Sequence, residues 1–238
     1  MSDKQNIEFI KEEAKSSVKE EQPWLLTYAD MMTLLFAFFV LLFSMSSIDP
    51  VKVSQLMDGM GDKPELKSFN EITEQFEDII EVLNLEDQAK VSRDPRGVTL
   101  EIDGDVCFQS GKTILLPELT QVLDLAAQKV LAQADDPRLI VVEGHTDNDP
   151  IPKDLLQYFP SNWELSSARA SKVVNYLIDI GVNSGKLQAS GYADRWPATL
   201  SWYDVRSGKV DNVIISENNK TLEQKKLNRR IKIVFTKN

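Results

Sequence analysis

One apolar run near the N-terminus constrains this chain more than any other feature. Residues 24–47 read WLLTYADMMTLLFAFFVLLFSMSS, and Asp30 is the one charged side chain in the run. An α-helix rises about 1.5 Å per residue, so the run would be roughly 36 Å long, enough to cross the hydrocarbon core of a bilayer with some tilt. We therefore predict a transmembrane helix over residues 24–47.

A cleaved signal peptide is the competing interpretation of this run. Two features oppose it, because the run is longer than the usual apolar region of a signal peptide, about 7–15 residues, and a mixed-charge tract precedes it. The positive-inside rule sets the orientation of a retained anchor. It places residues 1–23 in the cytoplasm and everything after residue 48 outside, because more lysines lie close before the run than after it: Lys11, Lys15 and Lys19 against Lys52 and Lys63.

Asp30 is the informative residue of the run. A carboxylate within a bilayer costs about 2.5–3.5 kcal/mol on insertion scales, so it indicates a function unless it stays wet near the interface, about 9 Å into the span. On a helical wheel, Thr33, Ala37 and Ser44 fall within roughly 60° of Asp30. Small and hydroxylated side chains are typical of a helix packed against protein. We expect this stripe to face a partner membrane protein, where Asp30 could take up and release a proton or a small cation.

The segment after the run predicts a short amphipathic helix over residues 48–60. Pro50 suits the first position of a helix, and apolar residues then recur at helical spacing: Val53, Leu56, Met57 and Met60. Such a helix could lie on the bilayer, cover a pore mouth or begin a linker, and the sequence does not choose between these. Residues 61–92 are rich in charged residues, and we interpret them as a linker helix with one apolar side.

Residues 93–238 change to an alternation of strands and helices. The patterns predict strands over residues 98–102, 139–143, 187–191 and 230–235, and helices or a helical turn over residues 117–134, 166–180 and 221–227. Residues 204–219 read as a loop or a small insertion. The order β-α-β-α-β-(α)-β predicts an α+β domain with a mixed sheet covered by helices.

Composition excludes several classes of function. The net charge of −10 and a pI near 4.8 argue against nucleic acid as the partner, because phosphate binding needs a surplus of Lys and Arg. One cysteine, Cys107, permits no intrachain disulfide and no multi-cysteine metal site. One histidine, His145, excludes a His-rich metal centre.

Polar residues gather where the predicted strand 139–143 ends. The run Glu143-Gly144-His145-Thr146-Asp147-Asn148-Asp149 follows that strand, and Asn162, Ser166 and Arg169 belong to the start of the next helix. Arg169 lies about one to two turns into that helix, from where its forked guanidinium could reach Asp147 or the carboxylate of a ligand.

Several chemistries compete for this cluster. A hydrolytic dyad of His145 with Ser166 lacks a nucleophile elbow or an oxyanion loop, and a metal site would need His145 together with Asp147 and Asp149. Two further interpretations, both of Arg169 and Asp147, stay open. Arg169 and Asp147 form a structural ion pair, or they hold a zwitterionic ligand between an acid and a guanidinium.

These residues resemble two known families. WLLTYADMMTLLFAFFVLLFSMSSID resembles the transmembrane signature of the MotB/PomB flagellar stator subunits, and GHTDNDPI, NWELSSARA, GYADRWPA and NRRIKIVF resemble successive motifs of the OmpA-like peptidoglycan-binding domain. The resemblance implies a non-enzymatic subunit without a cofactor. It implies a single-pass protein of the bacterial inner membrane, with a cytoplasmic N-terminus and a periplasmic C-terminal domain.

The resemblance also implies partners and roles. Two copies of the B subunit would sit as a dimer within a ring of MotA/PomA-type subunits, in a 5:2 complex that acts on the flagellar rotor. Ions would cross on Asp30, with Thr33 on the same stripe, and residues 48–60 would plug the channel before assembly. In the OmpA-like domain, Asp147 and Arg169 would hold the diaminopimelate stem of peptidoglycan. Their neighbours in the motif are Thr146, Asn162 and Leu165.

Three points stay open at the level of sequence. The segment between the two motifs, residues 148–161, is longer than the family pattern and contains three prolines. The YAD context is typical of proton-driven members, whereas the LFSMSSID end also occurs in sodium-driven relatives. A stator-like channel of a non-flagellar envelope or defence complex, or a plain membrane-tethered peptidoglycan-binding protein, would use the same parts.

Overall fold

The computed structural model describes residues 23–45, 67–109, 111–132 and 136–237. The chain divides into two compact units, Met1–Asp49 and Pro50–Asn238. The predicted plug segment, residues 48–60, lies outside the described residues, and so do its residues Val53, Leu56, Met57 and Met60.

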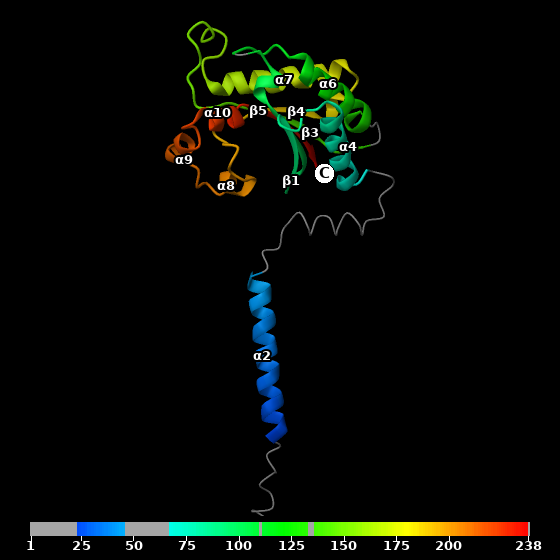
Figure 1. The fold of residues 1–238 in the computed structure, drawn as a ribbon, viewed down its shortest axis with the longest axis vertical. Helices are drawn as coiled ribbons and strands as arrows, with labels where there is room; N and C mark the ends of the chain where they lie inside the picture. Colours follow the sequence, from blue (N-terminus) through cyan, green and yellow to red (C-terminus); the bar gives the residue numbers. More distant parts are fainter. Residues whose placement is uncertain (1–22, 46–66, 110, 133–135, 238) are drawn as a thin grey trace, which may run out of the picture. The chain divides into compact units, whose positions relative to one another are not determined.

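The first unit contains helix α2, Pro23–Met45, drawn in blue in Figure 1. Its stretch Trp24–Leu41 is the one part of the described chain that is long and apolar enough to cross a membrane. Two hydroxyls along the helix are satisfied internally, because Thr27 Oγ1 and Thr33 Oγ1 donate to the carbonyls of Trp24 and Asp30 at 2.9 and 2.8 Å. Internal satisfaction of polar groups is what an apolar solvent demands. Helix α2 begins one residue before the predicted span.

The second unit is built on a five-stranded sheet with the strand order β1-β2-β5-β3-β4 (Figure 1). Strands β3 and β4 are parallel and the other neighbouring pairs are antiparallel. The predicted α+β fold with a mixed sheet is therefore confirmed. The strands are β1 Ala89–Asp94, β2 Gly97–Asp103, β3 Ile140–His145, β4 Leu187–Gly191 and β5 Arg230–Thr236.

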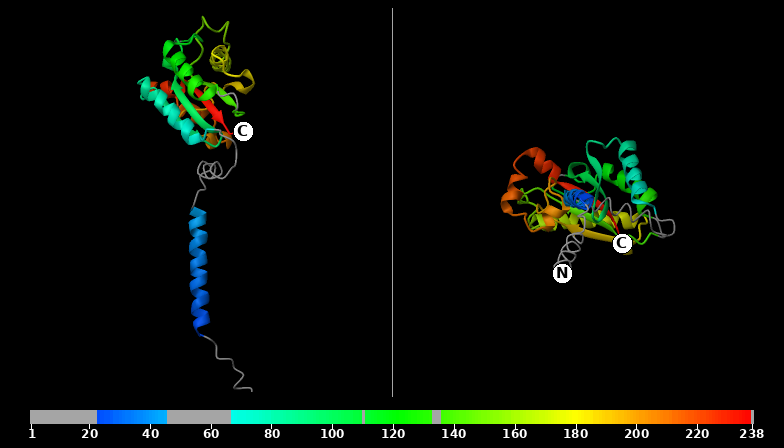
Figure 2. Two further views of the ribbon diagram at one scale, coloured as in Figure 1. Left: turned by 90° about the vertical axis from the view of Figure 1, so that its right-hand side faces the viewer. Right: turned by 90° about the horizontal axis from the view of Figure 1, so that it is seen from below.

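One face of the sheet carries the hydrophobic core. Leu100, Ile233 and Val142 lie in register across β2, β5 and β3, and all three are fully buried. Three helices cover this face, and Figure 2 shows α4 and α6 on the same side of the strands. They are α4 Phe69–Val82, α6 Pro117–Ala126 with its π-helical continuation Ala127–Leu131, and α7 Asn162–Asp179.

Helix α4 and strand β1 differ from the expected linker over residues 61–92. Ser68 and Glu71 form a capping box that starts α4. The helix then buries five apolar side chains in the core of the sheet domain: Phe69, Ile72, Phe76, Ile79 and Ile80. Because this apolar stripe finds a partner face, the folded unit begins well before residue 93.

The remaining elements position the polar loops. Helix α7 begins earlier than expected, because Ser161 and Glu164 form a capping box, and it stops before Gly181, whose φ is +98°. The insertion between β4 and β5 contains three short helices. The first two differ from the loop expected over residues 204–219, and the third matches the helical turn expected over residues 221–227. The three helices are α8 Trp202–Arg206, α9 Asn212–Glu217 and α10 Leu222–Asn228, and two further short elements are α5 Gly104–Cys107 and a 3₁₀ turn at Ser184–Lys186.

Candidate functional site

The candidate site lies where strand β3 ends beside the start of helix α7. Gly144 allows this close approach, because a Cβ at this position would come within 2.1 Å of the Ser166 carbonyl oxygen. Beyond β3 the chain continues into Thr146 and Asp147, both buried. The loop that carries Asp147 therefore lies beside the start of α7, and charged residues from two further elements contact this loop region.

Asp147 forms an ion pair with Arg229, the residue before strand β5. Arg229 Nη1 lies 2.8 Å from Asp147 Oδ2, and its Nη2 lies 3.4 Å from Asp105 Oδ2 in helix α5. Burial lowers the pKa of Arg229, but hydrogen bonds to the two acids outweigh this and raise it above the usual value. One exposed edge of this group remains, since the side chain of Arg229 is 32% exposed and that of Asp105 is 52% exposed.

Arg169 does not form the direct ion pair with Asp147 that the sequence suggested. Its guanidinium lies 5.1 Å from the ring centroid of Phe108, and its Nε donates to the Lys112 carbonyl at 3.2 Å. Burial lowers the pKa of Arg169, and the thiol of Cys107 and the carboxylate of Asp147 act in the opposite direction. A guanidinium stays charged at neutral pH even so. Arg169 is thus a buried cation that the charges of Asp147, Asp105 and Arg229 influence.

Asn162 shapes the loop that carries Asp147. Its Nδ2 donates to the carbonyls of Asp147 and Asp149 at 3.2 and 2.9 Å, while the Asp149 N–H donates to Asp147 Oδ1 at 3.1 Å. The Thr146 N–H donates to the Ala193 carbonyl at 2.9 Å. The Thr146 hydroxyl is buried and has no hydrogen-bond partner in this part of the chain, and Leu165 is buried.

This arrangement combines two acids with two guanidiniums in a half-open cluster. Carboxylates accept from an ammonium group, and a guanidinium binds a carboxylate in a two-pronged geometry. A small zwitterion that carries both groups, or an amino-acid centre within a larger polymer, would complement these charges. The sequence missed Arg229 and Asp105 as site residues. The sequence signal for Arg229 was the NRR run at the start of β5. The structure gives this run its meaning, because β5 lies beside β3.

Two other chemistries find no support among the described residues. The Ser166 hydroxyl donates to the Trp163 carbonyl and accepts from the Ala193 N–H, each at 3.1 Å, so it is held as a structural group. The His145 ring is buried and stacks on Tyr192 at a centroid distance of 5.3 Å. Within the described part of the chain, no three His, Cys, Asp or Glu side chains are grouped to hold a metal ion.

The second face of the sheet is charged instead of apolar. Glu101, Lys232 and Glu143 lie in register across β2, β5 and β3, and alternating charges on neighbouring strands attract one another. Trp196 covers this row, with Lys232 Nζ 4.8 Å and the Arg96 guanidinium 5.0 Å from its ring centroid. Arg96 also pairs with Glu143. This face therefore serves the stability of the sheet.

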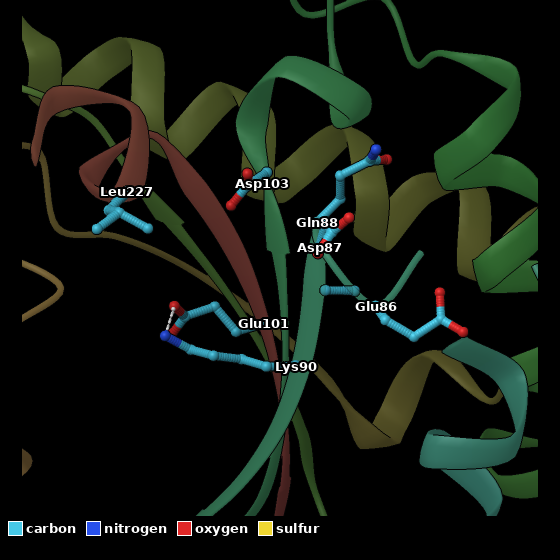
Figure 3. Close-up of a pocket in the computed structure, with 8 residues that line it drawn as sticks. Glu86, Asp87, Gln88, Lys90, Glu101, Asp103 and Leu227 are labelled. Atoms are coloured by element: carbon cyan, nitrogen blue, oxygen red, sulfur yellow. Dashed lines mark ion pairs between the residues drawn. The ribbon is translucent and has the colours of Figure 1, made fainter. Parts of the chain in front are cut away.

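A small acidic pocket of about 100 Å³ lies at the edge of the sheet (Figure 3). Two of its acids are already paired, since Lys90 Nζ lies 2.8 Å from Glu101 Oε1 and Lys226 Nζ lies 3.5 Å from Asp103 Oδ2. Burial raises the pKa of Asp103 despite the nearby lysine. This pocket is separate from the Asp147 cluster, and its lining does not include Asp147, Arg169 or Arg229.

Two family models match the chain. The model described as membrane MotB of the proton-channel complex MotA/MotB matches residues 10–63, and the OmpA family model matches residues 107–210. A Bacillus subtilis protein, YtxE, is 34% identical over 90% of this chain and 88% of its own length. Motility protein B of Bacillus subtilis is 26% identical over 90% of each chain.

Two solved structures share the fold of the second unit. A MotB-like protein from Desulfovibrio vulgaris superposes with a TM-score of 0.55 at 21% identity, over 71% of this chain and 94% of that chain. The cell wall anchor of the T6SS from Pseudomonas aeruginosa gives a TM-score of 0.51 at 26% identity, over 69% of this chain and 99% of that chain.

An apolar helix long enough to span a membrane, followed by an OmpA-like domain, defines a class of membrane-helix proteins with an OmpA-like anchor domain. Within this class, the matches to the plug model and to Motility protein B identify the family. The chain belongs to the MotB family.

Proposed function

We propose that this chain is the B-type subunit of an ion-driven flagellar stator and that it is anchored to peptidoglycan. The observation that carries the proposal is the joining of two parts in one chain. One is helix α2, in which Asp30 is the single charged side chain, and the other is an OmpA-like domain with a cluster of opposite charges at the end of β3. Neither part alone would distinguish a stator from a wall-binding protein or from a simple anchor.

Asp30 carries the ion in this proposal. A lone carboxylate in an apolar helix needs a wet, protein-lined route, which a second membrane protein of the MotA/PomA type supplies as a ring of five around two B subunits. The Thr33 hydroxyl bonds to the Asp30 carbonyl, so the polar stripe does not add an unsatisfied donor. Charging and neutralising Asp30 in turn shifts the balance between two conformations of the ring.

The topology follows from the same lysine bias that the sequence shows. Residues 1–23 lie in the cytoplasm, α2 crosses the inner membrane once, and the OmpA-like domain lies in the periplasm. Residues 48–60 close the ion route until the stator meets the wall. These assignments rest on the sequence and on the family.

The OmpA-like domain supplies the anchor. The diaminopimelate side chain of a peptidoglycan stem ends in an ammonium and a carboxylate on one carbon. Asp147 accepts from the ammonium, while Arg169 and Arg229 bind the carboxylate. Asn162 and Thr146 hold the loop, and Leu165 is buried in the same region. Without this anchor the reaction torque would turn the stator instead of the flagellar rotor.

The proposal is tested in the parent bacterium with the full-length gene. We expect Asp30→Asn to abolish swimming while its membrane level and its binding to purified sacculi match those of the wild type. We expect Asp147→Ala to reduce sacculus binding and swimming together. Swimming by the Asp30→Asn strain would refute the ion-carrier role, and undiminished sacculus binding by Asp147→Ala would refute the anchor site.

A second candidate is a wall-anchored ion channel or tether outside motility. The structural likeness to the T6SS cell wall anchor favours this candidate, because that protein has the same fold and its name places it in a secretion system instead of a flagellum. Deleting the gene separates the candidates: a flagellar stator is required for swimming and a component of another envelope system is not. If swimming is unaffected, loss of function by Asp30→Asn in that other system separates a channel from a plain tether.

A further inference from the structure

The insertion between β4 and β5 contacts the Asp147 loop through three separate links. Arg229 pairs with Asp147, Lys225 of α10 pairs with Asp149 at 2.5 Å, and the Asn219 side chain accepts the Asn148 N–H at 3.3 Å. Three consecutive loop residues are thus each held from the same insertion. The third link is a backbone contact and does not involve a charged group.

Asn219 is a buried amide whose polar atoms are all used. Its exposed fraction is 3%, its Nδ2 donates to the Ile215 carbonyl at 2.8 Å, and its Oδ1 accepts from Asn148 N–H and from Asn228 Nδ2, the latter at 2.9 Å. An amide with both ends bonded has one orientation, because turning it over would place like groups against each other. Asn219 therefore presents a fixed oxygen to the loop.

Asn228 connects the Asn219 amide to the chain segment that carries Arg229. It is 2% exposed, its Nδ2 also donates to the Asn218 carbonyl at 2.8 Å, and its Oδ1 accepts the Ala198 N–H at 2.7 Å. Asn228 is followed directly by Arg229 at the start of β5. One pair of amides thus spans from the residue after Asp147 to the residue before Arg229.

We infer that Asn219 is a positioning residue of the peptidoglycan site: through Asn148 and Asn228 it fixes the relative placement of the Asp147 carboxylate and the Arg229 guanidinium. The inference rests on the proposed function, which names the ligand. A charged site recognises a small zwitterion only when donor and acceptor are held within about half an ångström of the right geometry. Asn219 touches no ligand itself and acts through the two groups that do.

The test compares three variants of the full-length protein in detergent, with purified peptidoglycan sacculi as the probe. Asn219→Ala removes the oxygen that both Asn148 and Asn228 contact, and we expect sacculus binding about tenfold weaker. Asn219→Asp keeps an acceptor oxygen for Asn148 and Asn228 but sets a carboxylate oxygen against the Ile215 carbonyl, and we expect binding between that of Asn219→Ala and that of the wild type. Ser201→Ala removes the cap of α8 in the same insertion, and α8 carries none of the residues that contact Asn219 or the Asp147 loop, so it controls for a loss of stability alone.

The inference is overturned if folded Asn219→Ala binds like the wild type, or if Ser201→Ala weakens binding as much as Asn219→Ala does. A second measurement needs no variant. Amide hydrogen exchange of the ligand-free wild type should show the Asn148 N–H protected at least tenfold, and exchange at the rate of an open loop would contradict the inference even if Asn219→Ala fails to fold. Failure of the wild type itself to bind sacculi would count against the proposed function. The exchange experiment would still decide whether Asn219 holds the Asp147 loop in place.

Discussion

Arg229 Nη1 lies 2.8 Å from Asp147 Oδ2, so the acid at the end of β3 is paired with the start of β5 and not with helix α7. In the proposed complex, a ligand ammonium that approaches Asp147 meets a carboxylate that is already paired with a guanidinium. The proposal then requires the ligand to share or replace this ion pair, and it keeps Arg229 beside the ligand carboxylate. On this proposal the Asp147–Arg229 pair is part of the recognition geometry.

The first prediction concerns the coupling between these two residues. We expect Asp147→Asn and Arg229→Gln each to weaken sacculus binding about tenfold, because each removes the shorter ion pair of the cluster and leaves Arg229 or Asp105 as the remaining charge beside it. In the double variant the effects should not add, with an interaction free energy on the order of 1 kcal/mol in a double-mutant cycle. Strictly additive losses in co-sedimentation would show that the two side chains act separately.

The second prediction concerns Arg169. Its guanidinium packs on the Phe108 ring and donates to the Lys112 carbonyl, and an ammonium group reproduces neither the planar packing nor the fork. We expect Arg169→Lys to lose binding nearly as fully as Arg169→Ala, by more than tenfold. Arg195→Ala is the matched control, because this arginine is 48% exposed and its guanidinium contacts Asp194 and Asn212 instead of the acids of the cluster. Full binding by Arg169→Lys would reduce its role to that of a simple positive charge.

The third prediction concerns acid stability. Burial would raise the pKa of Glu101, but Arg230, Lys232 and Lys90 outweigh it and lower this pKa from 4.5 to about 2. A carboxylate whose pKa is lower in the folded state stabilises the fold fully above about pH 4.5, and this stabilisation is lost as the pH falls from there through 2. The shift corresponds to roughly 3 kcal/mol at most.

Urea unfolding between pH 2 and 7 measures this contribution. We expect Glu101→Gln to lower the free energy of unfolding at pH 7 and to flatten its decline below pH 4.5. Lys90→Gln is a milder comparison, since this lysine is more than half exposed. An unchanged acid limb in Glu101→Gln would show that other carboxylates govern acid unfolding.

Local patterns predicted most of the fold. The apolar run predicted α2, and the patterns of apolar residues predicted β2, β3, β4 and β5 in nearly the right places. Strand β1 escaped because AKVSRD is short and polar, and it becomes a strand only by pairing with β2. Helix α4 was recognised as amphipathic, but a pattern names no partner, so its packing against the sheet could not be foreseen.

The sequence predicted the candidate-site residues that lie close together along the chain. It did not predict which acid pairs with which arginine. Asp147, Asn162 and Arg169 belong to two adjacent motifs, and the structure places them near the same loop. Arg229 lies 82 residues beyond Asp147, and only the neighbouring of β3 and β5 brings the two together. His145 attracted catalytic and metal hypotheses because it is a lone histidine among acids. Its burial against Tyr192 and Trp196 shows a packing role.

The fourth prediction concerns residues 48–60, which lie outside the described residues. If they plug the ion route, deletion of residues 51–60 should raise ion leak and slow growth when the MotA-type partner is co-expressed. The same deletion expressed without the partner is the control and should be harmless. Normal growth with the partner present would leave this segment as a connection between α2 and the folded domain.

The most direct measurement is ion flux through the assembled complex. The full-length chain with residues 51–60 deleted is co-expressed with its MotA-type partner, and proton or sodium entry is followed with an internal indicator under an imposed membrane potential. We expect flux at least tenfold above cells that lack the partner, and a return to background with Asp30→Asn at equal membrane level. If the Asp30→Asn complex conducts as well as its parent, Asp30 does not carry the ion and the stator proposal fails.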